Sequence, residues 1–179
     1  KDFESTLGAG GGAKEIGDGA GASIAWGATS TGATTFKGSV DTKSGLTASS
    51  EVGAITFLEN VTISTANTDT ELKQNSLVLS GMTFDSAGNI NFGLSTDVGG
   101  DTLTLAAANV EIENDNTKTL NVYSKVEGNF DLVLDGAGAK IFKSTLGKTR
   151  GGTNYEIGDG TGASISWAAT STGATTFEG

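Results

Sequence analysis

The sequence predicts an all-β protein built as a parallel β-solenoid, and three observations support this prediction. The 179-residue chain has 28 glycines and no proline. Its short apolar segments alternate strictly with polar residues, and similar segments recur about every 20 residues. Proline removes a backbone donor and is excluded from central strands, so its absence suits a chain whose strands are paired along both edges.

The alternation has a period of two residues, which places one side chain inside a sheet and the next outside. Helical spacing of three and four residues does not appear, and only residues 70–78 could form a short helix. The alternating apolar pairs are Ile55/Phe57, Val61/Ile63, Leu77/Leu79, Ile90/Phe92, Leu103/Leu105, Val110/Ile112, Leu120/Val122 and Leu132/Leu134.

Glycine-led phrases set the length of the expected coil. "GATTFKGSV" at Gly32 and "GAITFLENVTI" at Gly53 are 21 residues apart, and Ala108 lies 20 residues from both Gly88 and Gly128, which open related phrases. The interval from Gly53 to Gly88 is 35 residues and fits less well. Repeats of this length indicate stacked coils that bury their apolar faces against each other. A β-sandwich is the alternative.

A larger repeat lies over this rhythm. Residues 15–38 match residues 156–179 at 20 of 24 positions, with an offset of 141 residues. Residues 1–8, "KDFESTLG", recur as "KIFKSTLG" at 140–147, with an offset of 139. We therefore predict that residues 1–141 form one tandem repeat unit of about seven coils. Residues 142–179 would begin the next unit and continue the same fold.

The charge of the chain excludes two classes of partner. The formal net charge is −10 and the sequence pI is about 4.3. Nucleic-acid binding needs a basic surface, and anionic membranes attract basic segments. No segment is apolar over the length of a membrane span, and a chain without cysteine has no disulfides. We expect neither nucleic-acid binding nor membrane insertion.

Two stretches carry a resemblance to known proteins. They are "STGATTFKGSVDTKSGLTASSEVGAITFLENVTISTANTDTEL" and "GNINFGLSTDVGGDTLTLAAANVEI". They resemble the β-strand repeats of large bacterial surface proteins of the filamentous-haemagglutinin and autotransporter-passenger type. The resemblance covers most of the chain and implies a secreted, rod-like, right-handed parallel β-helix that serves as an adhesin stalk or extracellular fibre. It implies no catalytic residue.

The two "EIGDG" copies contain the candidate metal ligands, Asp18 and Asp159. Carboxylates beside glycine turns suit Ca²⁺, which takes six to eight oxygen ligands. The simpler interpretation is a turn in which the aspartate accepts local backbone N–H bonds. We therefore expect no cofactor, with calcium as the alternative.

An enzyme is not expected. Asp97 with Asp101, or Asp131 with Asp135, could supply the two carboxylates of a glycoside hydrolase. The chain has no histidine or cysteine and only one arginine, so the usual bases and anion-binding groups are scarce. Trp26 and Trp167, at equivalent repeat positions, could stack on sugar rings but are more typical of core residues.

These observations predict a structural protein, a segment of an extracellular β-solenoid that builds a fibre, stalk or sheath by axial stacking. Its expected partner is itself, through end-to-end or lateral contacts, at a bacterial cell surface or outside the cell. The alternative is an adhesin or carbohydrate-binding module on a bacterial surface rod, with host or matrix glycans as partners. The expected inward core residues are Ile24, Trp26, Phe36, Ile55, Phe57, Ile90, Phe92, Leu103, Leu105, Phe130, Ile165, Trp167 and Phe177.

Overall fold

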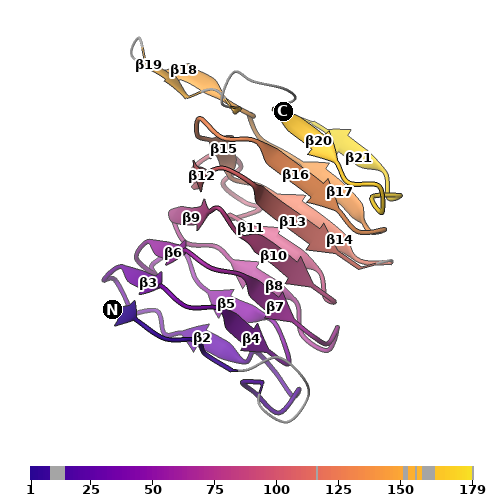
Figure 1. The fold of residues 1–179 in the computed structure, drawn as a ribbon. Helices are drawn as coiled ribbons and strands as arrows, with labels where there is room; N and C mark the ends of the chain where they lie inside the picture. Colours follow the sequence, from indigo (N-terminus) through magenta and orange to yellow (C-terminus); the bar gives the residue numbers. More distant parts are fainter. Residues whose placement is uncertain (9–14, 116, 151–152, 156, 159–163, 179) are drawn as a thin grey trace.

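The computed structural model is a β-solenoid of three parallel sheets, as the sequence predicts (Figure 1). It describes residues 1–8, 15–115, 117–150, 153–155, 157–158 and 164–178. The coils are stacked along one axis, with the amino-terminal strands at one end and the carboxy-terminal strands at the other (Figure 1). The parallel pairing decides between the two predicted architectures, because a sandwich of hairpins pairs its strands antiparallel.

Each coil contributes one strand to each sheet. Sheet A contains β1 (Asp2–Phe3), β3 (Thr34–Phe36), β6 (Ile55–Phe57), β9 (Ser76–Ser80), β12 (Thr102–Ala107) and β15 (Lys125–Glu127). Sheet B contains β4 (Val40–Thr42), β7 (Val61–Ile63), β10 (Thr83–Ser86), β13 (Val110–Asn114), β16 (Leu132–Asp135) and β20 (Ile165–Trp167). Sheet C contains β2 (Ile24–Trp26), β5 (Leu46–Ala48), β8 (Thr70–Leu72), β11 (Ile90–Phe92), β14 (Thr119–Val122), β17 (Ala139–Phe142) and β21 (Thr175–Phe177).

One further strand pair is antiparallel. β18 (Lys148–Arg150) and β19 (Thr153–Tyr155) form a hairpin beside the last coil, and it projects from the solenoid in Figure 1. Residues 70–78, the one candidate helix, instead contribute β8 and the start of β9. Thr70 and Leu72 are paired with Ile90 and Phe92, so neighbouring coils hold this segment extended.

The core is the interior of the coils. Each member of the eight alternating pairs is at most 2 % exposed, because the period of two directs one residue of every strand pair inward. The parallel register places like side chains above one another, as in Phe36 above Phe57 and Ile112 above Leu134. Stacking therefore creates the buried interior that no single coil has.

The coils are longer than the glycine spacing predicts. In sheet A the residues in register with Thr34 are Ile55, Leu77, Leu103 and Val126, at intervals of 21, 22, 26 and 23 residues. The longest interval includes the corner loop 93–101 between β11 and β12. Because corners vary in length while strands do not, a 141-residue unit makes about six coils rather than the expected seven.

Candidate functional site

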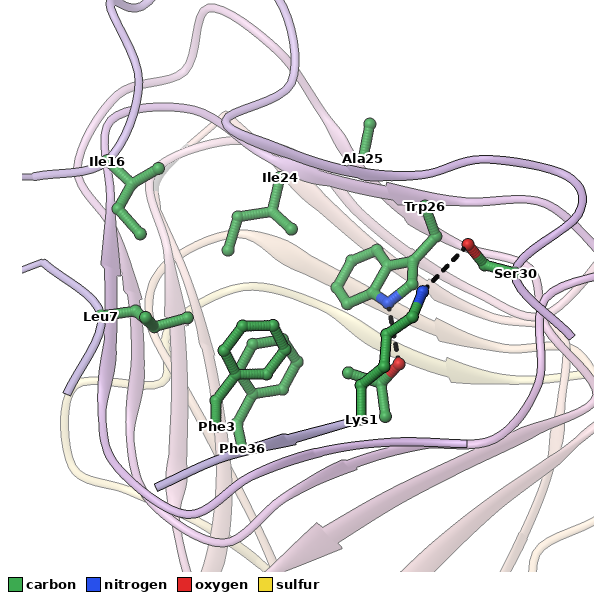
Figure 2. Close-up of a pocket in the computed structure, with 10 residues that line it drawn as sticks. Lys1, Phe3, Leu7, Ile16, Ile24, Ala25, Trp26, Ser30 and Phe36 are labelled. Carbon is green, nitrogen blue, oxygen red and sulfur yellow. Dashed lines mark hydrogen bonds between the residues drawn. The ribbon is translucent and has the colours of Figure 1, made fainter. Parts of the chain in front are cut away.

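The amino-terminal end of the solenoid has an open apolar recess of about 350 Å³ (Figure 2). Phe3, Leu7, Ile16, Ile24 and Trp26 line it, and all of them belong to the first coil. Phe3 is 37 % exposed, although its ring stacks on that of Phe36. The recess is therefore the open end of the core, where a further coil would bury these side chains.

Stacked rings continue from this recess into the core. The ring centroids of Phe3 and Phe36 are 4.9 Å apart with an interplanar angle of 8°, and Phe36 and Phe57 repeat this geometry at 4.9 Å and 10°. The Trp26 ring meets Phe36 edge-on at 5.9 Å. Aromatic pairs at these separations contribute about 0.5–1.5 kcal/mol beyond area burial. The ladder is one residue wide and is open at Phe3.

The carboxy-terminal end presents a second open surface, here called the C-terminal edge and formed by β20, β21 and Leu146. Trp167 is 49 % and Phe177 is 48 % exposed, although both were expected in the core. The Phe177 ring stacks on Phe142 at 5.3 Å, so its inner face is packed. The outer face lacks a neighbour because no described strand follows β21 in sheet C.

The two ends carry the same local structure. Phe3 is in register with Phe36 in the first copy, and Phe142 with Phe177 in the second. The Trp26 indole Nε1 donates to Thr34 Oγ1 at 3.2 Å, and the equivalent bond from Trp167 to Thr175 is 2.8 Å. The sequence repeat is therefore a repeat of three-dimensional contacts.

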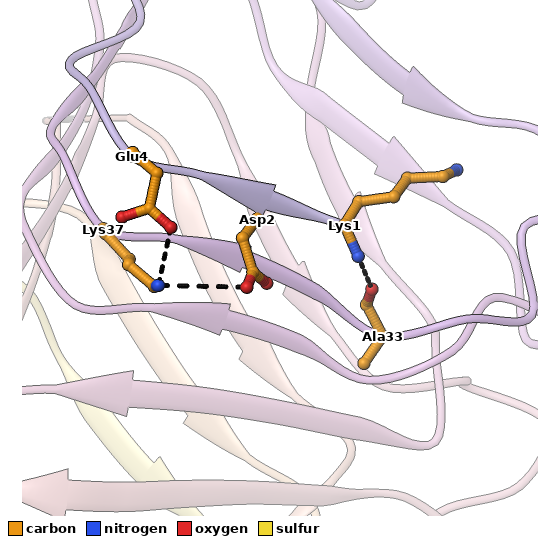
Figure 3. A network of polar contacts seen from close by, with 5 residues as sticks. All are labelled: Lys1, Asp2, Glu4, Ala33 and Lys37. Atoms are coloured by element: carbon orange, nitrogen blue, oxygen red, sulfur yellow. Dashed lines mark hydrogen bonds and ion pairs between the residues drawn. The ribbon is translucent and has the colours of Figure 1, made fainter.

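An ion pair marks each copy, with its charges exchanged. In the first copy Lys37 Nζ lies 2.7 Å from Glu4 and 3.8 Å from Asp2 (Figure 3). In the second copy Lys143 occupies the place of Glu4, and its Nζ lies 2.8 Å from Glu178, which replaces Lys37. The hydrogen bond and charge of Glu4 raise the pKa of Lys37. The exchange retains the attraction and reverses its direction.

Sheet B carries three carboxylates on its outer surface, here called the acidic row: Asp85, Glu113 and Asp135. The register places Glu113 between the other two on adjacent strands, about 4.8 Å apart in the hydrogen-bonding direction. Partial burial raises the pKa of Asp85, and the charges of Asp115 and Glu111 add to this. Burial, followed by Asp85 and Asp135, raises the pKa of Glu113. Like charges directly opposite one another destabilise a sheet.

One cation is buried at the corner between sheets B and C. The ammonium group of Lys140 is fully buried and donates to the carbonyls of Gly136 and Gly138, at 2.6 and 2.8 Å. Burial lowers the pKa of Lys140, while the charges of Asp135 and Glu113 oppose this effect. Its counterpart in the first copy, Lys1, is exposed. Lys140 is therefore a structural group that closes the corner by binding backbone oxygens.

The calcium candidates do not form a metal site. Asp18 Oδ1 accepts a hydrogen bond of 2.8 Å from the Ala20 backbone N–H, as in the simpler turn interpretation. Asp159 lies outside the described residues. Within the part of the chain that the structure describes, no group of three or more His, Cys, Asp or Glu residues is arranged to hold a metal ion.

The carboxylate pairs considered for hydrolysis are placed differently from one another. Asp101 is buried, and its Oδ2 accepts a bond of 2.9 Å from the Leu94 backbone N–H, so it shapes the corner loop. Asp97 is exposed on that loop. Asp135 belongs to the acidic row, and Asp131 precedes the same strand, β16.

The predicted core residues divide by position along the axis. The residues of the middle coils and Phe36 are buried, and Ile24, Trp26, Phe130 and Ile165 are partly buried against the core. Trp167 and Phe177 are the two predicted core residues that are exposed, because they lie on the last coil. Sequence reasoning missed the acidic row and the exchanged ion pairs. The second could have been found by aligning Glu4 with Lys143 and Lys37 with Glu178.

The comparisons with known proteins give no relative. No protein-family model matches this chain, and neither does any curated protein or solved structure. The described residues include no helix long and apolar enough to cross a membrane. The two open ends with their repeated contacts are thus the features that function must be argued from.

Proposed function

We propose that this chain is a structural β-solenoid segment that builds an extracellular fibre, stalk or sheath by axial stacking. The observation that carries the proposal is the pair of open ends. The recess at the first coil and the C-terminal edge both expose apolar side chains that the fold directs inward. Each end also presents a parallel strand edge with unpaired backbone groups, which recruits further strands.

Stacking would bury aromatic surface that is now in contact with water. Phe3, Trp167 and Phe177 are between 37 % and 49 % exposed. Completing the burial of a large apolar side chain of this kind contributes on the order of 1 kcal/mol each. New strand pairing adds backbone hydrogen bonds along three sheets. Together these terms favour end-to-end contact between copies.

The proposed location, at a bacterial cell surface or outside the cell, is supported by the resemblance of the strand phrases to those of large surface proteins. An acidic, repetitive chain is also suited to remain soluble as a long rod, since its net charge of −10 keeps rods apart laterally. A binding role on such a rod is the competing proposal.

Negative-stain microscopy of the concentrated chain tests the proposal. We expect unbranched filaments with an axial repeat of about 34 Å, from seven strands of sheet C at about 4.8 Å each. Phe3→Asp and Phe177→Asp should abolish them. Leu58→Asp and Val98→Asp are matched controls, because these residues are 37 % and 48 % exposed but lie outside the two ends, and both variants should still assemble.

A chain that stays monomeric by sedimentation at all concentrations would contradict axial stacking. If such a monomer is also retained on a glycan array, the adhesin or carbohydrate-binding alternative replaces the proposal. Loss of that retention in Trp167→Ala would then assign the sugar contact to the exposed indole.

A further inference from the structure

The second copy of the repeated sequence lies on different sheets from the first. β1 belongs to sheet A, whereas its counterpart β17 belongs to sheet C. β2 lies in sheet C and its counterpart β20 in sheet B, while β3 lies in sheet A and β21 in sheet C. Every repeated strand is thus displaced by the same amount, one side backwards in the order A, B, C.

The isolated bridges give the same displacement. Leu7 pairs with Val40 of sheet B, but its counterpart Leu146 pairs with Val126 of sheet A. Following the chain from β1 to β17, or from β3 to β21, passes 17 successive sides of the triangular coil. Because 17 is not a multiple of three, the repeat cannot return to its starting side.

The first copy shows what covers these strands when the chain continues. β5 covers β2, with Ile24 in register with Leu46 and Trp26 with Ala48. β6 covers β3, where Phe57 stacks on Phe36. The covering segment is residues 39–57, and its counterparts' positions on the C-terminal edge are vacant among the described strands.

The receiving surface of the second copy matches that of the first in detail. The turn "TSTGATTF" is identical at residues 29–36 and 170–177. In the first copy the Gly53 N–H of the covering segment donates to the Ser30 carbonyl at 3.0 Å. A Cβ at Gly53 would lie 2.4 Å from the Thr31 carbonyl oxygen, so only glycine allows this approach. The described residues provide no such donor to the equivalent carbonyl, that of Ser171.

We propose that the C-terminal edge is an acceptor for a second copy of segment 39–57, and that this copy enters one side back around the solenoid. The inference rests on the proposed axial stacking and specifies its geometry for joined units. Each unit is turned by a third of the circumference relative to the one before. Three units therefore direct any given surface, such as the acidic row, to all three sides of the rod.

Extension of the full chain by residues 39–57, joined directly after Gly179, tests the acceptor, because Gly179 corresponds to Gly38. In a Trp26→Phe background only Trp167 is fluorescent, and the added segment contains no tryptophan. Docking should lower the acrylamide quenching constant of Trp167 by roughly twofold, as a half-exposed indole becomes buried. It should also raise Tm.

A matched extension carries Leu46→Asp in the added segment, which places a carboxylate where the core needs an apolar side chain. This control should leave the quenching of Trp167 unchanged. Equal quenching in the chain, the extension and the control would overturn the acceptor.

Engineered disulfides test the rotation, since paired Cα atoms on adjacent parallel strands are within disulfide range. In the first copy Ala25 is in register with Thr47. Ser166 corresponds to Ala25, so Ser166→Cys should cross-link with Thr47→Cys of the added segment. If the segment instead kept its original side, it would lie on sheet C, and Thr176→Cys would form the cross-link.

The two proposals fail separately. Docking and the Ser166 cross-link without filaments would contradict axial assembly of free chains and leave the acceptor in place. Filaments from a chain whose extension does not dock, or cross-links through Thr176, would contradict the rotated acceptor alone.

Discussion

Phe36 and Phe177 occupy the same position in two copies of one sequence, yet Phe36 is 1 % exposed and Phe177 is 48 % exposed. Both stack on the phenylalanine of the strand before, and both lie beside a tryptophan that donates to a threonine. The difference is the strand after: β6 covers Phe36, and no described strand covers Phe177. In this fold, burial is a property of the neighbouring coil rather than of the local sequence.

The same comparison applies to lysine. Lys140 and Lys1 are equivalent in the repeat, but Lys140 is fully buried and its ammonium group binds two carbonyls, whereas Lys1 is exposed. The backbone N–H of Lys140 donates to Ala174 of the last coil. A residue type that is rarely buried is accommodated where its ammonium group finds fixed acceptors.

The largest expected effect separates the middle of the solenoid from its end. Phe57→Ala should lower the free energy of unfolding by about 3–5 kcal/mol, the usual loss for a fully buried phenylalanine. Phe177→Ala removes the same atoms from a half-exposed position and should lose roughly half as much or less. Urea unfolding followed by circular dichroism measures both. Equal losses would mean that the last coil is covered in solution.

The architecture could be predicted because parallel stacking leaves a local signal. The spacing of Ile55 and Phe57, or of Leu132 and Leu134, is that of a strand with one buried side, and all four are buried. The number of coils could not be predicted, because corners such as 93–101 differ in length without a regular pattern. The side on which a strand lies depends on that number, so the displacement of the second copy was not evident either.

The candidate site was predictable only in its composition. The repeat marked Trp167 and Phe177 as special, but their exposure depends on which coils are present. Asp18 was correctly read as a turn residue in the simpler of its two interpretations, because its partner is two residues away. The acidic row could not be foreseen, since Asp85 and Glu113 are 28 residues apart and meet only through the strand register.

The acidic row should make stability depend on pH with a definite sign. The folded-state pKa values of Asp85 and Glu113 are raised above their ordinary values of 3.8 and 4.5. The folded protein then binds these protons more tightly than the unfolded chain. Stability is greatest below the ordinary values and falls as pH rises through the raised ones. Tm should therefore be higher near pH 4 to 5 than at pH 7.

Glu113→Gln tests whether the row causes this dependence. Removing the central charge should raise the free energy of unfolding at pH 7 by a few tenths to about 1 kcal/mol, the range for cross-strand pairs, and should flatten the pH profile. Glu59→Gln, at an exposed residue outside the row, is the control and should retain the slope. A Glu113→Gln profile identical to that of the parent chain would assign the pH dependence to other carboxylates.

The smallest expected effect concerns the exchanged ion pairs. Glu178→Lys places a second cation beside Lys143 and should lower stability by no more than about 1 kcal/mol, because the pair is solvent-accessible. Adding Lys143→Glu restores opposite charges in the arrangement of the first copy and should recover the loss. The recovery should disappear near 1 M salt, where the screening length is about 3 Å.

A double variant that stays as unstable as the single one, or a loss that persists in high salt, would show that packing rather than charge sets the effect. The charge interpretation has a structural consequence. Pairing the first strand of one copy with the closing strand of the other would bring Glu4 beside Glu178, or Lys143 beside Lys37. The exchange therefore favours each closing strand on its own copy, which matters most in a molecule whose two ends are otherwise the same.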